Sequence, residues 1–304
     1  MTNRSKLFLL AFLLTLSLLI GCTTASAAST IPVVEQAEPV EDHAGAEDYI
    51  WDSAAVTHIV LTGDTANVEG TGAVVDGSTV TIRSAGNYSF SGVLADGQII
   101  VDTEDEALVR LILNGVQISN STTSPIYVAN AEETMIVLAD NTSNGVADGT
   151  SYVYASPEED EANAAIFSKS DLTVYGNGTL MVTGSYNDGI ASKDGLVIAS
   201  GAITVSAVDD AIRGKDYVVI EGGTISVNAG GDGVKSDNEE DADRGYIAIT
   251  DGIVNVTAGG DAIAAQTSVM ISGGTFSLVA GGGSGGRLAA DASAKGIRRV
   301  WFSK

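Results

Sequence analysis

Apolar and polar residues alternate in short runs along most of the chain, and between residues 188 and 283 these runs repeat. Each repeat holds two runs in which every second residue is apolar, the pattern of a β-strand with one buried face. Positions offset by 22, 22 and 29 residues carry similar side chains. The four buried columns that this register predicts are Leu196, Val218, Ile247 and Val269; Ile198, Ile220, Ile249 and Ile271; Ile203, Ile225, Val254 and Phe276; and Val205, Val227, Val256 and Leu278.

Small residues separate these runs, and no repeat shows a helical period. Glycine recurs between the two strands, at Gly201, Gly223, Gly252 and Gly274. A repeat in the low twenties that contains only strands indicates a solenoid in which each coil lies on the one before. We therefore predict an all-β fold, a single-stranded parallel β-helix of about 22 residues per tight coil, over residues 49–286.

The repeat is looser before residue 155, but strands and turns still alternate. The strand-like runs are His58–Leu61, Thr79–Ile82, Gln98–Val101, Val109–Leu113, Ile126–Val128 and Met135–Leu138. Proline is nearly absent after Pro39, as the interior of a sheet requires. We expect these runs to form the first coils, and the segment 49–57, with Trp51, to cover the open edge of the first one.

An aspartate recurs at one position of four successive repeats: Asp188, Asp210, Asp232 and Asp261. Equivalent residues of a parallel β-solenoid stack about 4.8 Å apart, so these carboxylates are expected to form a column at one corner. Two such charges repel by about 1 kcal/mol in water and by about 3 to 4 kcal/mol at an effective dielectric constant near 20.

A bound cation relieves this repulsion, and calcium fits best because it takes roughly six to eight oxygen ligands in irregular geometry. Asn187, Asp209 and corner carbonyls are the further candidate ligands. The alternative is that the aspartates serve only to hydrogen-bond the backbone of the turns.

The residues around these aspartates resemble a known family. The segments are N-D-G-I-A-S-K-D-G-L-V-I from Asn187, D-D-A-I-R-G-K-D from Asp209, G-G-D-G-V-K-S-D-N from Gly230 and A-I-F-S-K-S-D-L-T-V-Y-G-N-G-T-L from Ala165. They look like the bacterial carbohydrate-binding family of pectate-lyase-like β-helix surface proteins, over roughly residues 56–284. The resemblance implies a right-handed parallel β-helix, bound calcium, and a polysaccharide partner (polyuronate or cellulose-like) without established turnover.

The chain begins with the pattern of an exported lipoprotein. Arg4 and Lys6 precede an apolar run, which ends just before Cys22, the only cysteine. We predict a signal peptide over residues 1–21 and lipidation of Cys22, which anchors the exported protein at the bacterial cell surface through its lipid alone. Ordinary cleavage after Ala27, which releases a soluble protein, is the alternative. Residues 22–48 are predicted to be a disordered tether.

Acidic residues dominate the chain, whose formal net charge is -24. Nucleic acid is therefore not an expected partner, since its binding relies on clustered Lys and Arg. A bare polyuronate is repelled as well, unless cations bridge the two. Alternatively, the acidity keeps a Gly-rich β protein soluble or reflects a salty habitat. We expect a monomer.

Basic residues accompany the acid corner and raise a catalytic alternative. Lys193 and Lys215 share one column, and Arg213 and Lys235 share the next. Calcium with a nearby basic side chain is what pectate-lyase-type β-elimination uses, with Arg213 or Lys215 as the base. The alternative is that these basic side chains only neutralise the aspartates.

Neither histidine supports a catalytic triad, because His43 lies in the predicted tether and His58 is isolated in the first coils. The acidic insertion at residues 236–243 is expected to be either a calcium-binding flap or a solvated loop.

Tyr217 and Tyr246 are the candidate sugar platform. They precede inward-facing residues on adjacent coils, so both are expected to point outward and stack. Together with Lys193, Lys215 and Lys235 they form the predicted ligand-binding set. The alternative is that the tyrosine pair only stabilises the sheet.

Past residue 283 the repeat fails, and residues 287–304 are expected to form an irregular or truncated tail, although residues 293–297 look like the opening of a further coil. The preferred function is a non-catalytic, calcium-dependent polysaccharide-binding protein of the cell surface. The alternatives are a calcium-dependent polysaccharide lyase and a structural adhesin or stalk.

Overall fold

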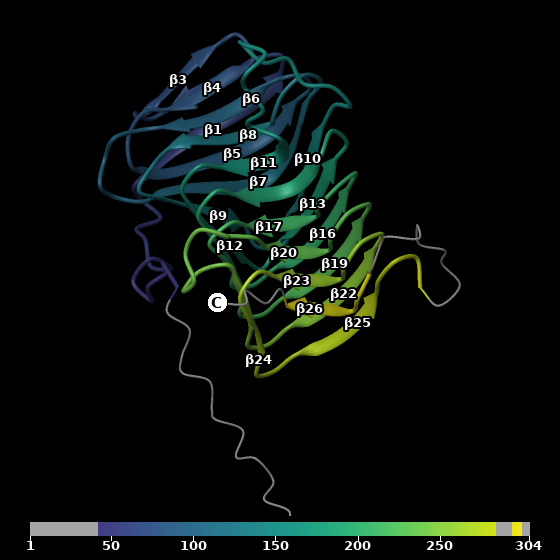
Figure 1. Cartoon of the computed structure of the whole chain (residues 1–304). Coiled ribbons are helices and arrows are strands. Elements are labelled where there is room, and N and C mark those ends of the chain that lie inside the picture. The colour runs from purple at the N-terminus through teal and green to yellow at the C-terminus, as the bar shows by residue number, and fades with distance from the viewer. Residues whose placement is uncertain (1–41, 284–293, 300–304) are drawn as a thin grey trace, which may run out of the picture. The chain divides into compact units, whose positions relative to one another are not determined.

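The computed structural model describes residues 42–283 and 294–299, and this part of the chain consists of strands and turns (Figure 1). The strands wind into a parallel β-solenoid of about eight turns, with about 25 residues per turn. The predicted fold class is thus confirmed. Since the described residues form no helix, they contain none long and apolar enough to cross a membrane.

Each regular coil contributes three strands, which stack in three rows. The first row is β9 (Glu133–Leu138), β12 (Asp171–Gly176), β15 (Gly195–Ile198), β18 (Tyr217–Ile220), β21 (Tyr246–Ile249) and β24 (Val269–Ile271). The second row is β10 (Ser143–Asp148), β13 (Thr179–Gly184), β16 (Ala202–Ala207), β19 (Thr224–Ala229), β22 (Ile253–Ala258) and β25 (Thr275–Val279).

The third row belongs to a separate sheet. It comprises β6 (Gln98–Asp102), β8 (Ile126–Asn130), β11 (Ala164–Ser168), β14 (Asp188–Ser192), β17 (Ile212–Gly214), β20 (Val234–Ser236), β23 (Ile263–Ala265) and β26 (Ile297–Arg299). In the tight coils the sequence predicted only the strands of the first two rows. The third-row strands β17, β20 and β23 are three residues long, too short for an alternating pattern to stand out.

The first coils join the two rows of the larger sheet. The long strand β7 (Val109–Asn120) pairs with β9 through its first half and with β10 through its second. On its other side it pairs with β5 (Gly86–Leu94).

The segment 49–57, which we expected to supply part of the cover of the first coil, contributes its last residues, Val56 and Thr57, to a strand. Two antiparallel pairs close this edge. They are β1 (Val56–Gly63) with β2 (Ala66–Glu69), and β3 (Ala73–Asp76) with β4 (Thr79–Ile82). Each hairpin supplies backbone partners to its own edge, which a segment without strand pairing does not.

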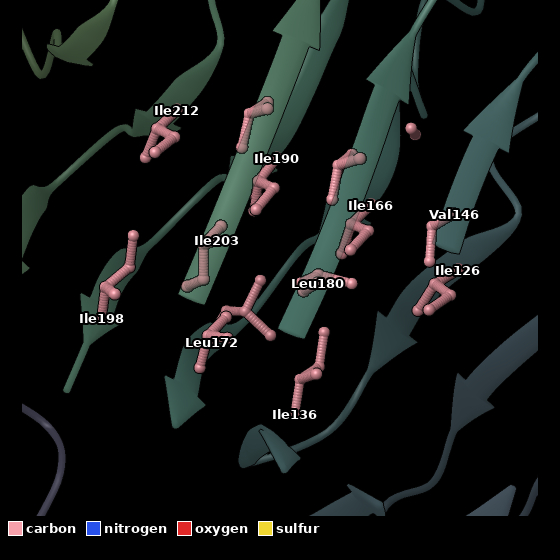
Figure 2. Packing of buried hydrophobic residues seen from close by; sticks show 14 of the residues in the cluster. Ile126, Ile136, Val146, Ile166, Leu172, Leu180, Ile190, Ile198, Ile203 and Ile212 are labelled. Atoms are coloured by element: carbon pink, nitrogen blue, oxygen red, sulfur yellow. The ribbon is translucent and has the colours of Figure 1, made fainter. Parts of the chain in front are cut away.

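The core is a stack of aliphatic side chains between the three rows. In Figure 2, Leu172 and Ile198 of the first row, Leu180 and Ile203 of the second and Ile190 of the third point into the same interior. Strand pairing confirms all four predicted columns. Each buried aliphatic side chain contributes about 1.5 to 3 kcal/mol of hydrophobic stabilisation, so like residues on successive coils fix the register.

The turn between the first and second rows requires glycine. Gly201, Gly223, Gly252 and Gly274 have φ angles of 114°, 90°, 109° and 98°, a region that other residues rarely adopt. The same turn is therefore rebuilt at four successive coils.

Part of the expected irregular tail is ordered in the fold. Strand β26 pairs with β23, and the Ala262 amide donates to the Lys295 carbonyl. Residues 294–299 therefore open a further coil, as the segment 293–297 suggested, while residues 284–293 and 300–304 lie outside the described part.

Candidate functional site

The four aspartates of the predicted column lie on successive coils, at the turn that leads from the second row into the third. Oδ1 of each carboxylate accepts a hydrogen bond from the backbone amide of the next aspartate. The distances are 3.1 Å from Asp188 to Asp210, 2.8 Å from Asp210 to Asp232 and 2.7 Å from Asp232 to Asp261. Asp261 accepts in turn from the Lys295 amide at 2.6 Å. We call this chain of bonds the aspartate ladder.

Most of the second carboxylate oxygens of the ladder face a basic side chain of the following coil. Oδ2 of Asp188 lies 3.6 Å from Arg213, Oδ2 of Asp210 lies 2.8 Å from Lys235, and Oδ2 of Asp261 lies 3.1 Å from Arg298.

Asp232 is the exception among the four. Ala264 occupies the basic position of the next coil, so the basic group near Asp232 is Lys235 of its own coil, at 3.9 Å. Basic side chains therefore neutralise most of the column, which is the alternative role expected for Arg213 and Lys235.

A denser carboxylate cluster stands at the Asp188 end of the ladder. Asp188, Asp209 and Asp210 each offer an oxygen, and these oxygens lie within 4.8 Å of one another. The Asp188 side chain is 1% exposed, and its Oδ2 has no hydrogen-bond partner. Asn187 adjoins the cluster, and its carbonyl accepts the Asp209 amide at 3.0 Å. Asp232 and Asp261, also predicted ligands, lie further along the ladder.

The protein environment disfavours ionisation at this cluster. Burial, together with the neighbouring charge of Asp210, raises the pKa of Asp188 to about 7, despite the opposing effect of Arg213. Burial and the Asp210 charge also raise the pKa of Asp209. Three carboxylates in a partly desolvated corner, one of which has an oxygen without a hydrogen-bond partner, suit a hard cation with oxygen ligands.

The predicted basic residues are engaged in ion pairs. Arg213 lies 2.8 Å from Asp237, Lys215 lies 3.3 Å from Glu240, and Lys193 pairs with Glu161. Burial acts to lower the pKa of Arg213, but the nearby carboxylates, above all Asp237, outweigh it and raise the pKa. The pKa of Lys235 is raised in the same way by Asp210. Both side chains are therefore less available in the unprotonated form that a catalytic base requires.

The acidic insertion begins as an ordered part of the corner. Ser236 and Asn238 are buried, and Asn238 Nδ2 donates to Asp216 Oδ1 at 2.5 Å. Residues 239–244 are exposed. Asp237 brings the insertion to Arg213, one coil earlier, so its first residues belong to the charged surface of the acid corner.

The predicted tyrosine platform forms but is partly covered. The rings of Tyr217 and Tyr246 stack at 5.2 Å with 12° between their planes. Tyr217 leans across Gly195, where a Cβ atom would lie 2.2 Å from its ring. Its hydroxyl lies 2.7 Å from His43 Nδ1 and also accepts the His43 amide at 3.0 Å. Both tyrosines remain only half-buried.

Residues 42–49 account for this cover, and they differ from the disordered tether expected up to residue 48. The Asp48 carbonyl accepts two hydrogen bonds from the Arg110 guanidinium, and Tyr49 meets Tyr175 edge-on at 4.9 Å. The sequence gives no sign of this contact, because single residues, not a periodic run, make it. We call residues 42–49 the covering segment.

His43, which the sequence left without a role, lies in a buried cluster of titratable groups. Its ring contacts Tyr217 and Thr173, with Glu133 at 3.8 Å and Asp171 at 3.3 Å. Burial lowers the pKa of His43 to about 4 and raises those of Glu133 and Asp171 to about 7 and 6. His58 is exposed on β1 and takes no part.

The fold is a parallel β-solenoid, and a solved protein shares it. A polysaccharide lyase-like protein from C. thermocellum, solved as a gadolinium derivative, matches with a TM-score of 0.68 and 35% identity, over 79% of this chain and 99% of that chain. The family model of the carbohydrate-binding domain-containing proteins matches residues 76–300, and the chain belongs to this family.

A relative from Acetivibrio thermocellus has the same family description. This carbohydrate-binding domain-containing protein is 40% identical to the chain over 150 residues, which make up 49% of this chain and 52% of the relative. The matched region thus spans about half the length of that relative. The family resemblance expected from the sequence is confirmed.

Proposed function

We propose that this domain binds an acidic polysaccharide of the polyuronate type, through calcium held by Asp188, Asp209 and Asp210, and does not cleave it. Membership of a carbohydrate-binding family supports a polysaccharide partner. The observation that carries the proposal is the buried Oδ2 of Asp188, which has no hydrogen-bond partner and lies in a cluster of three carboxylates.

The oxygen donors of this cluster fit calcium, which prefers carboxylates and carbonyls in flexible geometry. When bound, calcium supplies a positive charge that can meet a sugar carboxylate at the surface of an acidic protein. The related structure from C. thermocellum is a gadolinium derivative, and gadolinium is likewise a hard cation that prefers oxygen ligands. Asn187 directly precedes Asp188 in the sequence and is a further candidate ligand.

A binding role is favoured over a lyase because the candidate bases are already paired. Arg213 is held between Asp237 and Asp188, and the raised pKa of its guanidinium leaves it protonated. Lys215 faces Glu240 of the acidic insertion. Proton abstraction requires an unprotonated base within reach of the sugar, and the ion pairs oppose that state.

We place this domain at the cell surface on the strength of the sequence alone. The lipidation signal at Cys22 falls outside the described residues, as does most of the predicted tether. Export exposes the domain to extracellular polysaccharide and to calcium at the concentrations that weak extracellular sites need. Metabolic labelling with palmitate, lost in Cys22→Ala, tests the anchor.

Retention in an affinity gel containing polygalacturonate tests the binding proposal. With calcium present the domain is expected to be retarded, and a chelator should abolish the retardation. Asp209→Asn removes a cluster carboxylate without touching the ladder and should bind weakly. Asp251→Asn, the same charge change at an exposed turn between the first and second rows, is the matched control.

Three outcomes would contradict the proposal. Retardation that survives the chelator would show that binding does not need calcium. Equal binding of Asp209→Asn and Asp251→Asn would show that the carboxylate cluster is not the binding site. Ultraviolet absorbance from an unsaturated product, formed during incubation with calcium, identifies a lyase. A structural stalk predicts neither retardation nor product.

A further inference from the structure

Three tyrosines that the sequence did not single out gather beside the acid corner. Tyr152 and Tyr154 come from the excursion between β10 and β11, and Tyr186 from the turn between β13 and β14. Tyr152 and Tyr186 stack at 4.2 Å with 13° between their ring planes. Tyr154 meets Tyr186 at 6.5 Å and 64°, and Tyr152 at 6.2 Å and 53°. All three remain partly exposed.

Hydrogen bonds hold two of these rings in place. The Tyr152 hydroxyl donates to Asp148 Oδ2 at 2.8 Å or to the Ala164 carbonyl at 3.1 Å. The Tyr154 hydroxyl lies 3.0 Å from the Ala162 carbonyl. Both hydroxyls are therefore tied to the start of β11, and the rings form a rigid aromatic surface on which little side-chain freedom is left to lose on binding.

Two exposed valines neighbour these features in the sequence. Val153, between the first two tyrosines, is 74% exposed, and Val208, directly before Asp209, is 60% exposed. The Val208 amide donates to the Gly184 carbonyl, which places Val208 one coil below the turn that carries Tyr186. The exposed parts of the three tyrosine rings form an apolar patch, and such patches mark binding sites.

The patch and the carboxylate cluster adjoin on two coils. Tyr186 precedes Asp188 by two residues, so their α-carbons lie within about 7 Å of each other. Val208 directly precedes Asp209 in the next coil. A ligand that spans both features must be apolar on one side and carboxylated on the other.

We propose that Tyr186, supported by Tyr152 and Tyr154, is the platform for a pyranose ring of a uronate polymer whose carboxylate faces the Asp188, Asp209 and Asp210 cluster. This inference rests on the proposed function and names the second half of its site. The C–H face of a pyranose packs on an aromatic ring, while its carboxylate projects from the ring edge. A neutral glucan offers the same face without the carboxylate.

The position of this site also follows from what covers the other tyrosines. Tyr217 and Tyr246 lie in the first row, where the covering segment contacts Tyr217. Tyr186 lies at the turn between the second and third rows. The acid corner is at that same turn. A polymer that engages the carboxylate cluster therefore meets Tyr186 without displacing His43.

Affinity gels with polygalacturonate and calcium test the platform through three variants. Tyr186→Ala is expected to weaken binding about three- to tenfold, the range of an aromatic contact, while Tyr186→Phe keeps wild-type affinity because the ring is retained. Tyr246→Ala tests the rival platform in the first row, and a platform at Tyr186 predicts that this variant binds as wild type. Thermal unfolding of each variant checks that the fold is intact.

The outcomes separate this inference from the proposed function. If wild type binds only with calcium and Tyr186→Ala binds equally well, the platform is wrong and the cation site stands. If Tyr246→Ala is the weakened variant, the sugar lies on the first row instead. If wild type is not retarded at all, both the Tyr186 platform and the proposed function are wrong.

Chemical modification provides a test that needs no variant. Nitration with tetranitromethane, mapped by peptide mass spectrometry, should modify Tyr186 in the free protein. Polygalacturonate with calcium is expected to protect it at least about threefold, and polymer with chelator should not. Equal nitration under the two conditions would overturn the platform.

Discussion

The acid corner and the tyrosine face of the first row are both stacks of like residues on successive coils, yet they are used differently. At the acid corner each aspartate carboxylate accepts a hydrogen bond from a backbone amide of the next coil. Asp209, the exposed member of the carboxylate cluster, remains at the surface. At the tyrosine face, residues from outside the repeat lie over Tyr217. Register decides which residues stack, whereas the segments outside the repeat decide which of them a ligand reaches.

The two regions also handle buried charge differently. Three of the four ladder carboxylates face a basic side chain of the next coil. The cluster around His43 instead holds Glu133 and Asp171, whose raised pKa values show that burial resists their ionisation. Basic partners thus offset part of the cost of burial in the ladder, although burial still raises the pKa of Asp188 to about 7, whereas burial dominates in the covered cluster.

The largest effect is expected from cutting the ladder. Asp210→Ala removes the acceptor of the Asp232 amide and the partner of Lys235. The loss leaves the partly buried Lys235 with only the more distant Asp232, at 3.9 Å, and should cost about 3 kcal/mol in the free energy of urea unfolding. Asp210→Asn keeps the amide acceptor and should cost about 1 kcal/mol. Equal losses in the two variants would contradict the ladder as a structural element.

A pH-dependent effect is expected at the covered cluster. Burial raises the pKa of Glu133 from 4.5 to about 7 in the folded protein, so its contribution to stability is full below pH 4.5 and is lost as pH rises through 7. Glu133→Gln removes the cost of ionisation. The variant should be more stable than wild type by about 2 kcal/mol near pH 8 and equal to it near pH 4.

Urea unfolding of both proteins across this pH range provides the measurement. His43 acts in the opposite sense, since its lowered pKa makes stability fall as pH drops from 6.5 through 4. Because His43 is neutral in both proteins near pH 8, the difference measured there comes from Glu133. A constant difference between variant and wild type across the range would show that Glu133 does not titrate as burial predicts.

The covering segment can be loosened from beneath, with a smaller effect. Gly195→Ala places a methyl group where the Tyr217 ring lies, 2.2 Å from its nearest atom. The ring must shift and weaken its two bonds to His43, which should cost about 1 to 2 kcal/mol in thermal unfolding. In a His43→Ala background the same change should cost less, because the shared contact is already gone. If the stability losses of Gly195→Ala and His43→Ala are additive, Gly195 does not act through the covering segment.

Much of the fold could be predicted from the sequence because its information is local and repeated. The columns headed by Leu196 and Ile203 repeat at a nearly constant offset, and each fills the same place in the core. The aspartate column follows from the same register. The third row was missed in the tight coils because strands such as β17 contain one core residue and little alternation.

The candidate site could be predicted only in part, because its remaining contacts join distant segments. His43 reaches Tyr217 across 174 residues, and Tyr152 meets Tyr186 across an irregular excursion. Neither pair has a spacing that repeats. The register does align Ala264 with Arg213 and Lys235, but it does not show that this column faces the carboxylates of the preceding coil.

Calcium titration by isothermal calorimetry tests the central claim, that the Asp188 end of the ladder is a cation site while the remainder is structural. Wild type is expected to bind calcium saturably, Asp209→Asn at least about tenfold more weakly, and Asp251→Asn as wild type, with similar unfolding temperatures without calcium. No heat of binding in wild type, or equal affinity of Asp209→Asn and wild type, would contradict the account.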